Sequence, residues 1–252
     1  MDKITFTKRK ELDYRVNEAY KTLRTNIQFC GDDNKVIAIT SCTPNEGKSS
    51  VSFNLAVSFA ENGKKVILVD ADLRKSVLIG RYKVGEVEAG LTHYLSGQAD
   101  IRNILLETDI PNMDIIFSGS LCPNPAELLE HNRFQLLLQK LREKYDYVIV
   151  DTPPLGSVID SAIVAKIADG AILVIESNTI SYRFAQNVKA QLDKSGCKIL
   201  GAILNKIPME SKGYYGKYYG KYYGAYYGTY GSEKEKRKKV KKDAVDTVSD
   251  EA

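Results

Sequence analysis

A strand-like run that leads through a short loop into a helical pattern constrains the fold of this chain most strongly. The run begins at Val36, the loop ends in Gly47-Lys48-Ser49, and a helical pattern follows over residues 48–62. Unpaired N–H groups and the helix dipole at such a helix start favour a bound phosphate. Lys48 adds a positive charge, and the Ser49 hydroxyl suits Mg²⁺. The segment therefore predicts a site for nucleotide phosphates, in preference to an ordinary strand–loop–helix turn.

The loop departs from the usual GxxxxGK[ST] pattern, because Cys42 stands at its first glycine. Asn45 lies where a tight phosphate loop often needs a positive φ, and asparagine tolerates that conformation better than most residues. We expect the nucleotide to be bound by the loop and the start of the helix, namely by Pro44, Asn45, Glu46, Gly47, Lys48, Ser49 and Ser50.

Short β-branched runs alternate with helical patterns up to residue 208, which is typical of a doubly wound, mostly parallel α/β sheet. With the phosphate loop, this predicts the P-loop NTPase class, close to the ATPases with a deviant phosphate loop. Ligands in such sheets bind beyond the carboxyl ends of the strands. The predicted strands are 36–41, 65–70, 113–118, 147–151, 171–176 and 198–205, and the predicted helices are 48–62, 132–144, 161–167 and 181–194.

Carboxylates stand at the ends of two of these strands. Asp70 and Asp72 close the run that begins at Val66, and alternation along a strand would put both on one face. Asp151 ends another strand in the same way. Mg²⁺ usually needs only one or two protein carboxylates, so one aspartate is left to accept a proton from an attacking hydroxyl. A single such aspartate would indicate only turn chemistry, but three beside a phosphate loop favour phosphoryl transfer.

An amphipathic helix is predicted before the first strand. Its apolar residues recur at helical spacing and predict one buried stripe, made of Leu12, Val16, Ala19, Leu23 and Ile27. Its polar face carries Glu18, Lys21 and Arg24. We therefore divide the chain into an N-terminal helical segment over 1–34, a core over 35–208 and a tail over 209–252.

The tail has a different composition from the rest of the chain. A period-four pattern of tyrosines and glycines fills residues 214–231, and each glycine costs a helix about 1 kcal/mol. A basic run and an acidic end follow, so we predict a disordered segment. The tyrosines that could accept phosphate are Tyr214, Tyr215, Tyr218, Tyr219, Tyr222, Tyr223, Tyr226, Tyr227 and Tyr230.

The charge distribution argues against a nucleic-acid-binding core. The net charge is +4, and residues 209–252 hold ten Lys/Arg against seven Asp/Glu, which leaves about +1 for the rest. Four widely spaced cysteines and two histidines argue against a zinc site or a disulfide framework and favour a reducing cytosol. No apolar run approaches the roughly 18–20 residues of a membrane span, and we see no signal peptide.

These motifs together resemble the bacterial tyrosine kinases (BY-kinases) of capsule and exopolysaccharide biosynthesis, in their soluble Gram-positive form. The resemblance covers essentially the whole chain. It rests on PNEGKSS in the loop, ILVDADLR and VIVDTPP at the acidic strands, and the repeated YYG of the tail. It implies phosphate transfer from ATP, with Mg²⁺, to tyrosine hydroxyls of proteins, including the tyrosines of its own tail.

The resemblance also implies a role for each residue of the site. Lys48 would stabilise the β- and γ-phosphates, and Ser49 would bind Mg²⁺ directly. Asp72 and Asp151 would hold the metal through water molecules. Asp70 would orient or deprotonate the acceptor tyrosine.

Two further features follow from the same resemblance. Asn205, at the end of the last predicted strand, resembles the residue that contacts the base in related ATPases. The family joins its subunits into a ring through an ExxRxxR motif, which reads here as Glu18, Lys21 and Arg24, with lysine in the place of an arginine. A solvated, charged helix face is the alternative interpretation of those three residues.

The implied partners are proteins. A membrane protein of the polysaccharide chain-length type (a co-polymerase) would recruit this cytoplasmic chain to the inner face of the membrane and activate it through a cytoplasmic tail. A tyrosine phosphatase would reset the tail, and other substrates would act in polysaccharide synthesis. We do not expect nucleic acid as a partner, although an aromatic and basic tail can also bind single strands or anionic lipid.

Two other functions compete with the kinase. A partitioning or cell-division ATPase shares the expected fold, but it carries a signature lysine where this chain has Thr43. The second competing function is that of an assembly adaptor, which binds ATP but has no kinase activity. The acidic residues speak against the adaptor, and the tyrosine-rich tail speaks against the ATPase.

Overall fold

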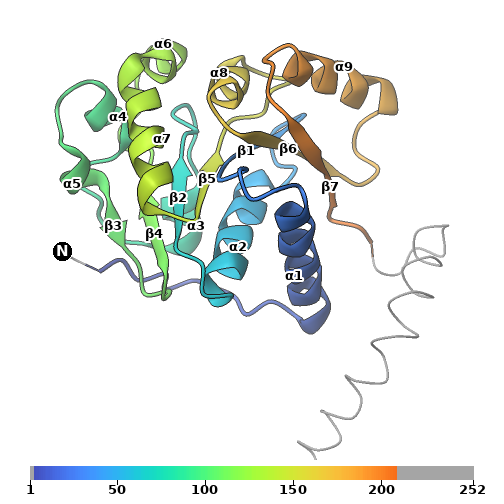
Figure 1. Cartoon of the computed structure of the whole chain (residues 1–252), viewed down its shortest axis with the longest axis horizontal. Coiled ribbons are helices and arrows are strands. Elements are labelled where there is room, and N and C mark those ends of the chain that lie inside the picture. Colours follow the sequence, from blue (N-terminus) through green and yellow to red (C-terminus); the bar gives the residue numbers. More distant parts are fainter. Residues whose placement is uncertain (1–2, 209–252) are drawn as a thin grey trace, which may run out of the picture. The chain divides into compact units, whose positions relative to one another are not determined.

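One sheet of seven strands forms the centre of the part of the chain that the structure describes, residues 3–208 of a computed structural model (Figure 1). The strand order is β3-β4-β2-β5-β1-β6-β7, and only the edge pair β3–β4 is antiparallel. The predicted mostly parallel α/β class is confirmed. The strands are β1 (Val36–Ser41), β2 (Val66–Asp70), β3 (Leu106–Glu107), β4 (Met113–Ile116), β5 (Tyr147–Asp151), β6 (Gly170–Glu176) and β7 (Ile199–Asn205).

The three central strands are buried along their whole length, which explains their nearly continuous apolar sequences. The register of β2 and β5 pairs Asp70 with Asp151, so the two carboxylates leave the sheet at the same edge. Strand β1 lies beside β5 and delivers the chain into the phosphate loop at that edge. The sheet order, which the sequence did not predict, thus brings the acidic motifs to the loop.

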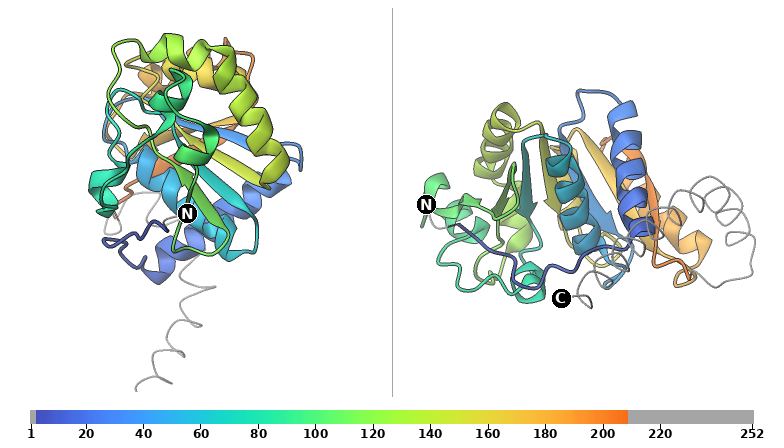
Figure 2. Two further views of the ribbon diagram at one scale, coloured as in Figure 1. Left: turned by 90° about the vertical axis from the view of Figure 1, so that its left-hand side faces the viewer. Right: turned by 90° about the horizontal axis from the view of Figure 1, so that it is seen from below.

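Helices cover both faces of the sheet (Figures 1 and 2). One face carries α1 (Tyr14–Phe29), α2 (Lys48–Glu61) and α3 (Leu78–Tyr82). The other face carries α4 (Leu91–Leu95), α5 (Ile101–Ile104), α6 (Pro125–Glu130), α7 (Asn132–Lys144), α8 (Asp160–Lys166) and α9 (Tyr182–Asp193). The prediction missed β3 and α3 to α6, because elements of two to six residues are too short to show a period.

The predicted buried stripe of the first helix is wrong over its first half. Leu12 precedes the helix, which Asp13 caps by accepting from the Val16 N–H at 2.9 Å. Leu12, Val16 and Ala19 are exposed. From Tyr20 onward α1 packs against α2, where Asn54 Nδ2 donates to the Tyr20 hydroxyl at 3.4 Å, so that Leu23 is half-buried and Ile27 is buried.

Residues 3–206 of the described part of the chain belong to one compact unit. The N-terminal helix α1 therefore belongs to the same unit as the sheet. A separate oligomerisation role for 1–34 stays a prediction. The predicted tail, 209–252, lies outside the described residues. Among residues 3–208, no helix is long and apolar enough to cross a membrane.

Candidate active site

The loop between β1 and α2 has the backbone shape of a phosphate-binding loop. Asn45 has a φ of 69°, which confirms the positive φ predicted there, and Gly47 has a φ of 90°. A Cβ atom on Gly47 would also lie 2.3 Å from Nδ2 of Asn205. The backbone angle requires glycine here, and a side chain would in addition displace the Asn205 amide from the loop. Helix α2 starts directly afterwards at Lys48.

Side chains behind the loop hold this shape. The buried Glu46 carboxylate accepts from the Thr43 N–H at 2.7 Å and from the Glu176 N–H at 3.3 Å. Asn205 Nδ2 donates to the Glu46 carbonyl at 2.9 Å, and Lys206 Nζ donates to the Asn45 carbonyl at 2.6 Å. The Glu46 and Asn205 side chains thus brace the loop in this structure. Their predicted contacts with a nucleotide stay predictions, as does that of the exposed Pro44.

Lys48 lies at the centre of a buried cluster of charges. Its Nζ is 3.0 Å from Asp72 Oδ2 and 3.8 Å from Asp151 Oδ2. It also lies 3.3 Å from the Ser49 hydroxyl oxygen. Burial by itself would lower the pKa of Lys48, but the carboxylates of Asp151 and Asp72 outweigh it and raise that pKa. The lysine is therefore fully charged and already oriented by carboxylates.

Asp70 and Asp151 are fully buried, and both have raised pKa values. Burial is the main cause at Asp70, the Asp151 charge adds to it, and together they raise the pKa to about 7. The Ser76 hydroxyl donates to Asp70 and opposes the shift. Burial likewise raises the pKa of Asp151, although Lys48 and the Ser52 hydroxyl, at 2.9 Å, favour its charged form. A carboxyl group with a pKa near neutrality can exchange a proton with a substrate at physiological pH.

The sequence argument for Asp72 needs one correction. Strand β2 ends at Asp70, so Asp72 lies in the following loop and not on the same strand face. The loop returns its carboxylate to Lys48, and the Lys75 N–H donates to Asp72 Oδ1 at 3.0 Å. The predicted site residues Lys48, Asp70, Asp72 and Asp151 are thus brought together, but by a turn in place of strand alternation.

The cluster fits a magnesium–nucleotide complex by its charge. Three buried aspartates surround one buried lysine, so a further cation would reduce a net negative charge inside the protein. Within residues 3–208, no three acidic, histidine or cysteine side chains converge as a complete metal site. Mg²⁺ commonly keeps waters and phosphate oxygens besides one or two carboxylates. The donors Ser49, Asp72 and Asp151 suit that kind of partial coordination.

Several residues that support the site were missed. Ser52 follows Lys48 by one helical turn and lies beside Asp151; Ser76 holds Asp70. Arg74 forms two hydrogen bonds, of 2.8 and 2.9 Å, with the buried Asp160 at the start of α8. The i,i+4 spacing of Ser52 was a usable signal. The sequence held no signal for the pairing of Arg74 with Asp160, because 86 residues separate the two.

The three residues predicted to join subunits make contacts inside this chain. Lys21 Nζ lies 2.7 Å from the Glu18 carboxylate, one turn earlier on α1. Arg24 does not point to solvent from a polar face, because its guanidinium donates to the Ser58 carbonyl of α2 at 2.7 Å. Glu18 is half-buried and Lys21 is exposed. Their role between subunits stays a prediction.

Comparison with known proteins agrees with this geometry. The family model described as an AAA domain matches residues 34–200. The tyrosine-protein kinase CpsD of Streptococcus agalactiae is 44% identical over 80% of this chain and 87% of its own length. The tyrosine-protein kinase YwqD of Bacillus subtilis is 40% identical over 84% of this chain and 90% of its own.

This chain belongs to the bacterial tyrosine-kinase family. The kinase domain of Escherichia coli tyrosine kinase ETK has the same fold, with a TM-score of 0.74 and 33% identity over 78% of each chain. The family resemblance that the phosphate loop and the acidic strands predicted is confirmed. The comparisons do not support a partitioning ATPase, or an ATP-binding adaptor without kinase activity, better than they support the kinase family.

Proposed function

We propose that this chain is an ATP-dependent protein-tyrosine kinase that phosphorylates the tyrosines of its own tail. The observation that carries the proposal is the buried cluster in which Lys48 contacts Asp72 and Asp151 at the start of α2. Asp70, with a pKa raised to about 7, lies beside that cluster. The arrangement combines a phosphate-binding cation, metal-binding carboxylates and a group able to take a proton.

Each residue then has a chemical task. Bound Mg²⁺ would neutralise phosphate charge, and Ser49, Asp72 and Asp151 are the residues to hold it. Lys48 would move from its carboxylate partners towards the β- and γ-phosphates. As the γ-phosphorus leaves its bridging oxygen on ADP and bonds the tyrosine oxygen, Asp70 accepts the phenolic proton. The loop N–H groups from Asn45 to Ser50 orient the nucleotide, and Pro44, which has no N–H, would contribute only its carbonyl and ring.

The tail is within reach of this site by chain length. Asn205 and Lys206 both contact the phosphate loop. Tyr214 follows Asn205 by nine residues, which span at most about 30 Å when extended. The nine tail tyrosines, from Tyr214 to Tyr230, lie outside the described residues, so their use as acceptors rests on the sequence. We propose transfer to the tail of a neighbouring copy.

Assembly and regulation form the finer part of the proposal. Glu18, Lys21 and Arg24 would contact a neighbour in a ring, and phosphate on several tails would loosen that ring by repulsion. A membrane co-polymerase would recruit and activate the kinase, a phosphatase would reset it, and the output would be control of capsule or exopolysaccharide synthesis. Light scattering of phosphorylated and dephosphorylated samples tests the ring: equal masses would contradict the loosening.

One experiment tests the activity directly. The purified chain is incubated with Mg-ATP, with and without the cytoplasmic tail of the membrane partner, and modified tyrosines are mapped by mass spectrometry. We expect phosphate on residues 214–230 in the wild type and none in Lys48→Met. Phosphotyrosine that appears in Lys48→Met at the wild-type rate would overturn the proposal, because the phosphate would then come from another kinase.

A further inference from the structure

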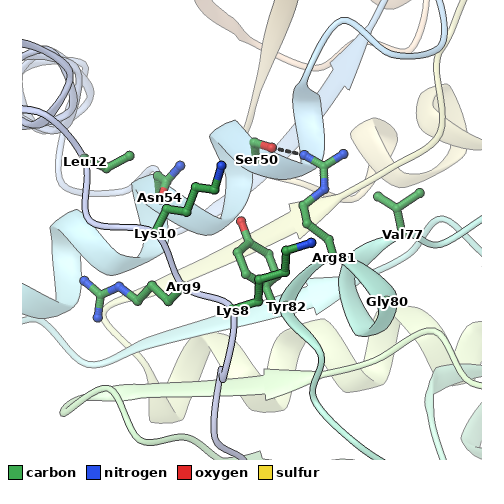
Figure 3. A pocket seen from close by; sticks show the side chains of 10 residues that line it. All are labelled: Lys8, Arg9, Lys10, Leu12, Ser50, Asn54, Val77, Gly80, Arg81 and Tyr82. Atoms are coloured by element: carbon green, nitrogen blue, oxygen red, sulfur yellow. Dashed lines mark hydrogen bonds between the residues drawn. The ribbon is translucent and has the colours of Figure 1, made fainter.

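A cavity of about 670 Å³ opens beside the first turn of α2 (Figure 3). Its walls come from three segments that are far apart in sequence: residues 8–12 of the N-terminal segment, Ser50 and Asn54 of α2, and residues 77–82, which include α3. None of the residues that line it is Lys48, Asp70, Asp72 or Asp151. The cavity therefore shares Ser50 with the phosphate-binding loop and is otherwise distinct from the catalytic cluster.

Three cations of this cavity have no acidic partner. In residues 3–208, no carboxylate forms an ion pair with Lys8, Lys10 or Arg81, whereas the adjacent Arg9 lies 3.1 Å from Glu61. Arg81 instead donates to the Ser50 hydroxyl. Figure 3 shows Lys8 beside Tyr82 and the ends of Lys10 and Arg81 towards Ser50, with Arg9 turned away from them. Exposed cations of one sign at one cavity favour an anionic ligand.

The backbone that carries the two lysines is firmly attached. Phe6 is buried, with its ring centroid 4.9 Å from Phe53 and 5.7 Å from Tyr82. The Lys8 N–H donates to the Tyr82 carbonyl at 3.2 Å, and the Thr7 hydroxyl donates to the Lys83 carbonyl at 2.8 Å. The segment is thus fixed on α3, and its lysine side chains start from a preorganised position.

At two places, a residue that lines the cavity directly follows a residue of the catalytic cluster or one that contacts it. Ser49 belongs to the predicted metal site, and the next residue, Ser50, lines the cavity. Ser76 donates to Asp70, and the next residue, Val77, lines the cavity. A peptide whose tyrosine reaches Asp70 would therefore pass the cavity with a nearby residue.

The walls of the cavity also suit an aromatic ring. Leu12 and Val77 are each 37% exposed, and both line the cavity together with Tyr82. An apolar wall beside unpaired cations matches a ligand with an aromatic body and an anionic end. A phosphate monoester carries nearly two charges and three acceptor oxygens, so it can use several cations at once.

We propose that this cavity binds a phosphotyrosine of the tail while the kinase modifies another tyrosine of the same tail. The proposal rests on the proposed kinase function and deepens it. Tyrosine pairs recur every four residues in 214–231, so pairs lie about 13 Å apart in an extended chain. Because transfer is proposed to a neighbour's tail, the ligand belongs to the tail of a second copy. Once one phosphate is present, it would anchor the tail and favour further transfer.

Peptide binding tests the site without catalysis. Fluorescent peptides of residues 213–231, with one phosphotyrosine or none, are titrated into the Lys48→Met chain and followed by anisotropy. We expect the phosphopeptide to bind at least tenfold more tightly than the plain peptide. The added substitutions Lys8→Ala and Lys10→Ala should remove that difference, and Lys8→Arg with Lys10→Arg should keep most of it. The matched control is the double variant Lys166→Ala, Lys194→Ala, which replaces two exposed lysines, one in α8 and one at the end of α9.

Several outcomes would overturn the proposal. The first is that both peptides bind with equal affinity. The second is that the preference for the phosphopeptide persists in the Lys8→Ala, Lys10→Ala variant while thermal unfolding shows that this variant is folded. Inorganic phosphate that competes as well as the phosphopeptide would reject recognition of the aromatic ring. Binding to vesicles with anionic lipid in place of the phosphopeptide would assign the cavity to a membrane surface.

A time course on the active enzyme separates this proposal from the kinase proposal. Intact-mass spectrometry counts phosphates on each tail during incubation with Mg-ATP and the cytoplasmic tail of the membrane partner. We expect Lys8→Ala with Lys10→Ala to lower the ratio of multiply to singly phosphorylated tails about tenfold, and the control pair to leave it unaltered. A wild-type chain that never incorporates phosphate refutes the kinase, whereas a normal ratio in the lysine variant refutes only the cavity.

Discussion

The catalytic cluster and the basic cavity lie next to each other but hold their charges in opposite ways. Lys48 is buried against two aspartates, with 3.0 Å to the nearer one. Lys8 and Lys10 stand exposed, without an acidic partner in the described part of the chain. Buried charges shift each other's pKa values and affect folding, whereas exposed charges interact weakly with the rest of the protein.

This difference separates two kinds of function. A preorganised cluster in a low-dielectric environment can stabilise a transition state, but changing one member disturbs the others. Exposed cations can recognise an anion at little cost in stability. The same substitution type, loss of one lysine, should therefore have large consequences at Lys48 and small ones at Lys8.

The largest effect is expected for Lys48→Met. Loss of the cation that contacts transferring phosphate should lower the rate of tail phosphorylation by about 10³-fold or more. The substitution also leaves Asp72 and Asp151 without their cation, so the melting temperature should fall in the absence of Mg-ATP. Initial rates by mass spectrometry and a thermal scan measure both. A rate within tenfold of the wild-type rate would show that Lys48 does not take part in phosphate transfer.

The next effect concerns the attachment of the basic segment. Phe6→Ala should cost about 3 kcal/mol of unfolding free energy, because it opens a void beside the stacked rings of Phe53 and Tyr82. Urea denaturation measures the loss. Phosphopeptide binding should weaken with it, since Lys8 and Lys10 would lose their fixed backbone. If stability fell while phosphopeptide affinity stayed the same, the cavity would not depend on preorganisation.

Asp70→Asn should slow phosphorylation by about 10²-fold, the lower range for a lost general base. The same variant should be more stable than the wild type at pH 8, by roughly 1–3 kcal/mol. The sign follows from the raised pKa of about 7: the folded state holds its proton more tightly than the unfolded state. The stability of the wild type therefore falls as pH rises from about 4 to 7. The asparagine of the variant does not titrate, so the variant does not lose this stability. A less stable variant would show that the Asp70 carboxylate supports the fold.

The pH profile sharpens the role of the same carboxyl group. If Asp70 accepts the tyrosine proton, kcat/KM for the wild type should rise about tenfold from pH 6 to pH 8, with an apparent pKa near 7. Steady-state assays with a tail peptide and saturating Mg-ATP give this profile. Asp70→Asn should be flat over the same range, and an equally steep rise in that variant would assign the titration to another group.

The smallest effect is expected for Arg9→Ala. Its exposed ion pair with Glu61 should contribute less than about 1 kcal/mol to unfolding. Phosphopeptide affinity should change less than threefold, because the Arg9 charge is paired and turned away from Lys8 and Lys10. A loss in phosphopeptide affinity as large as that of the lysine pair would show that general basicity, and not the arrangement in the cavity, attracts the phosphate.

The sequence predicted the parts of this protein that local rules govern. The strand–loop–helix around Gly47, the positive φ of Asn45 and the acidic strand ends all follow from residue type and spacing within about fifteen positions. The strand bounds were close for the same reason: β1 and β5 agree at both ends with the predicted ranges. The family followed from those motifs together.

Only the tertiary structure decided how distant residues meet. The register of β2 on β5 placed Asp70 beside Asp151, and a turn carried Asp72 back to Lys48. The predicted stripe failed at Leu12, Val16 and Ala19, which stay exposed, because the packing of α1 on α2 is centred on Tyr20, Leu23 and Ile27. The basic cavity left no trace in the sequence, because Lys8 and Arg81 are brought together by the packing of Phe6 on Tyr82. Periodicity records which face of an element is buried, but it does not record the element that covers it.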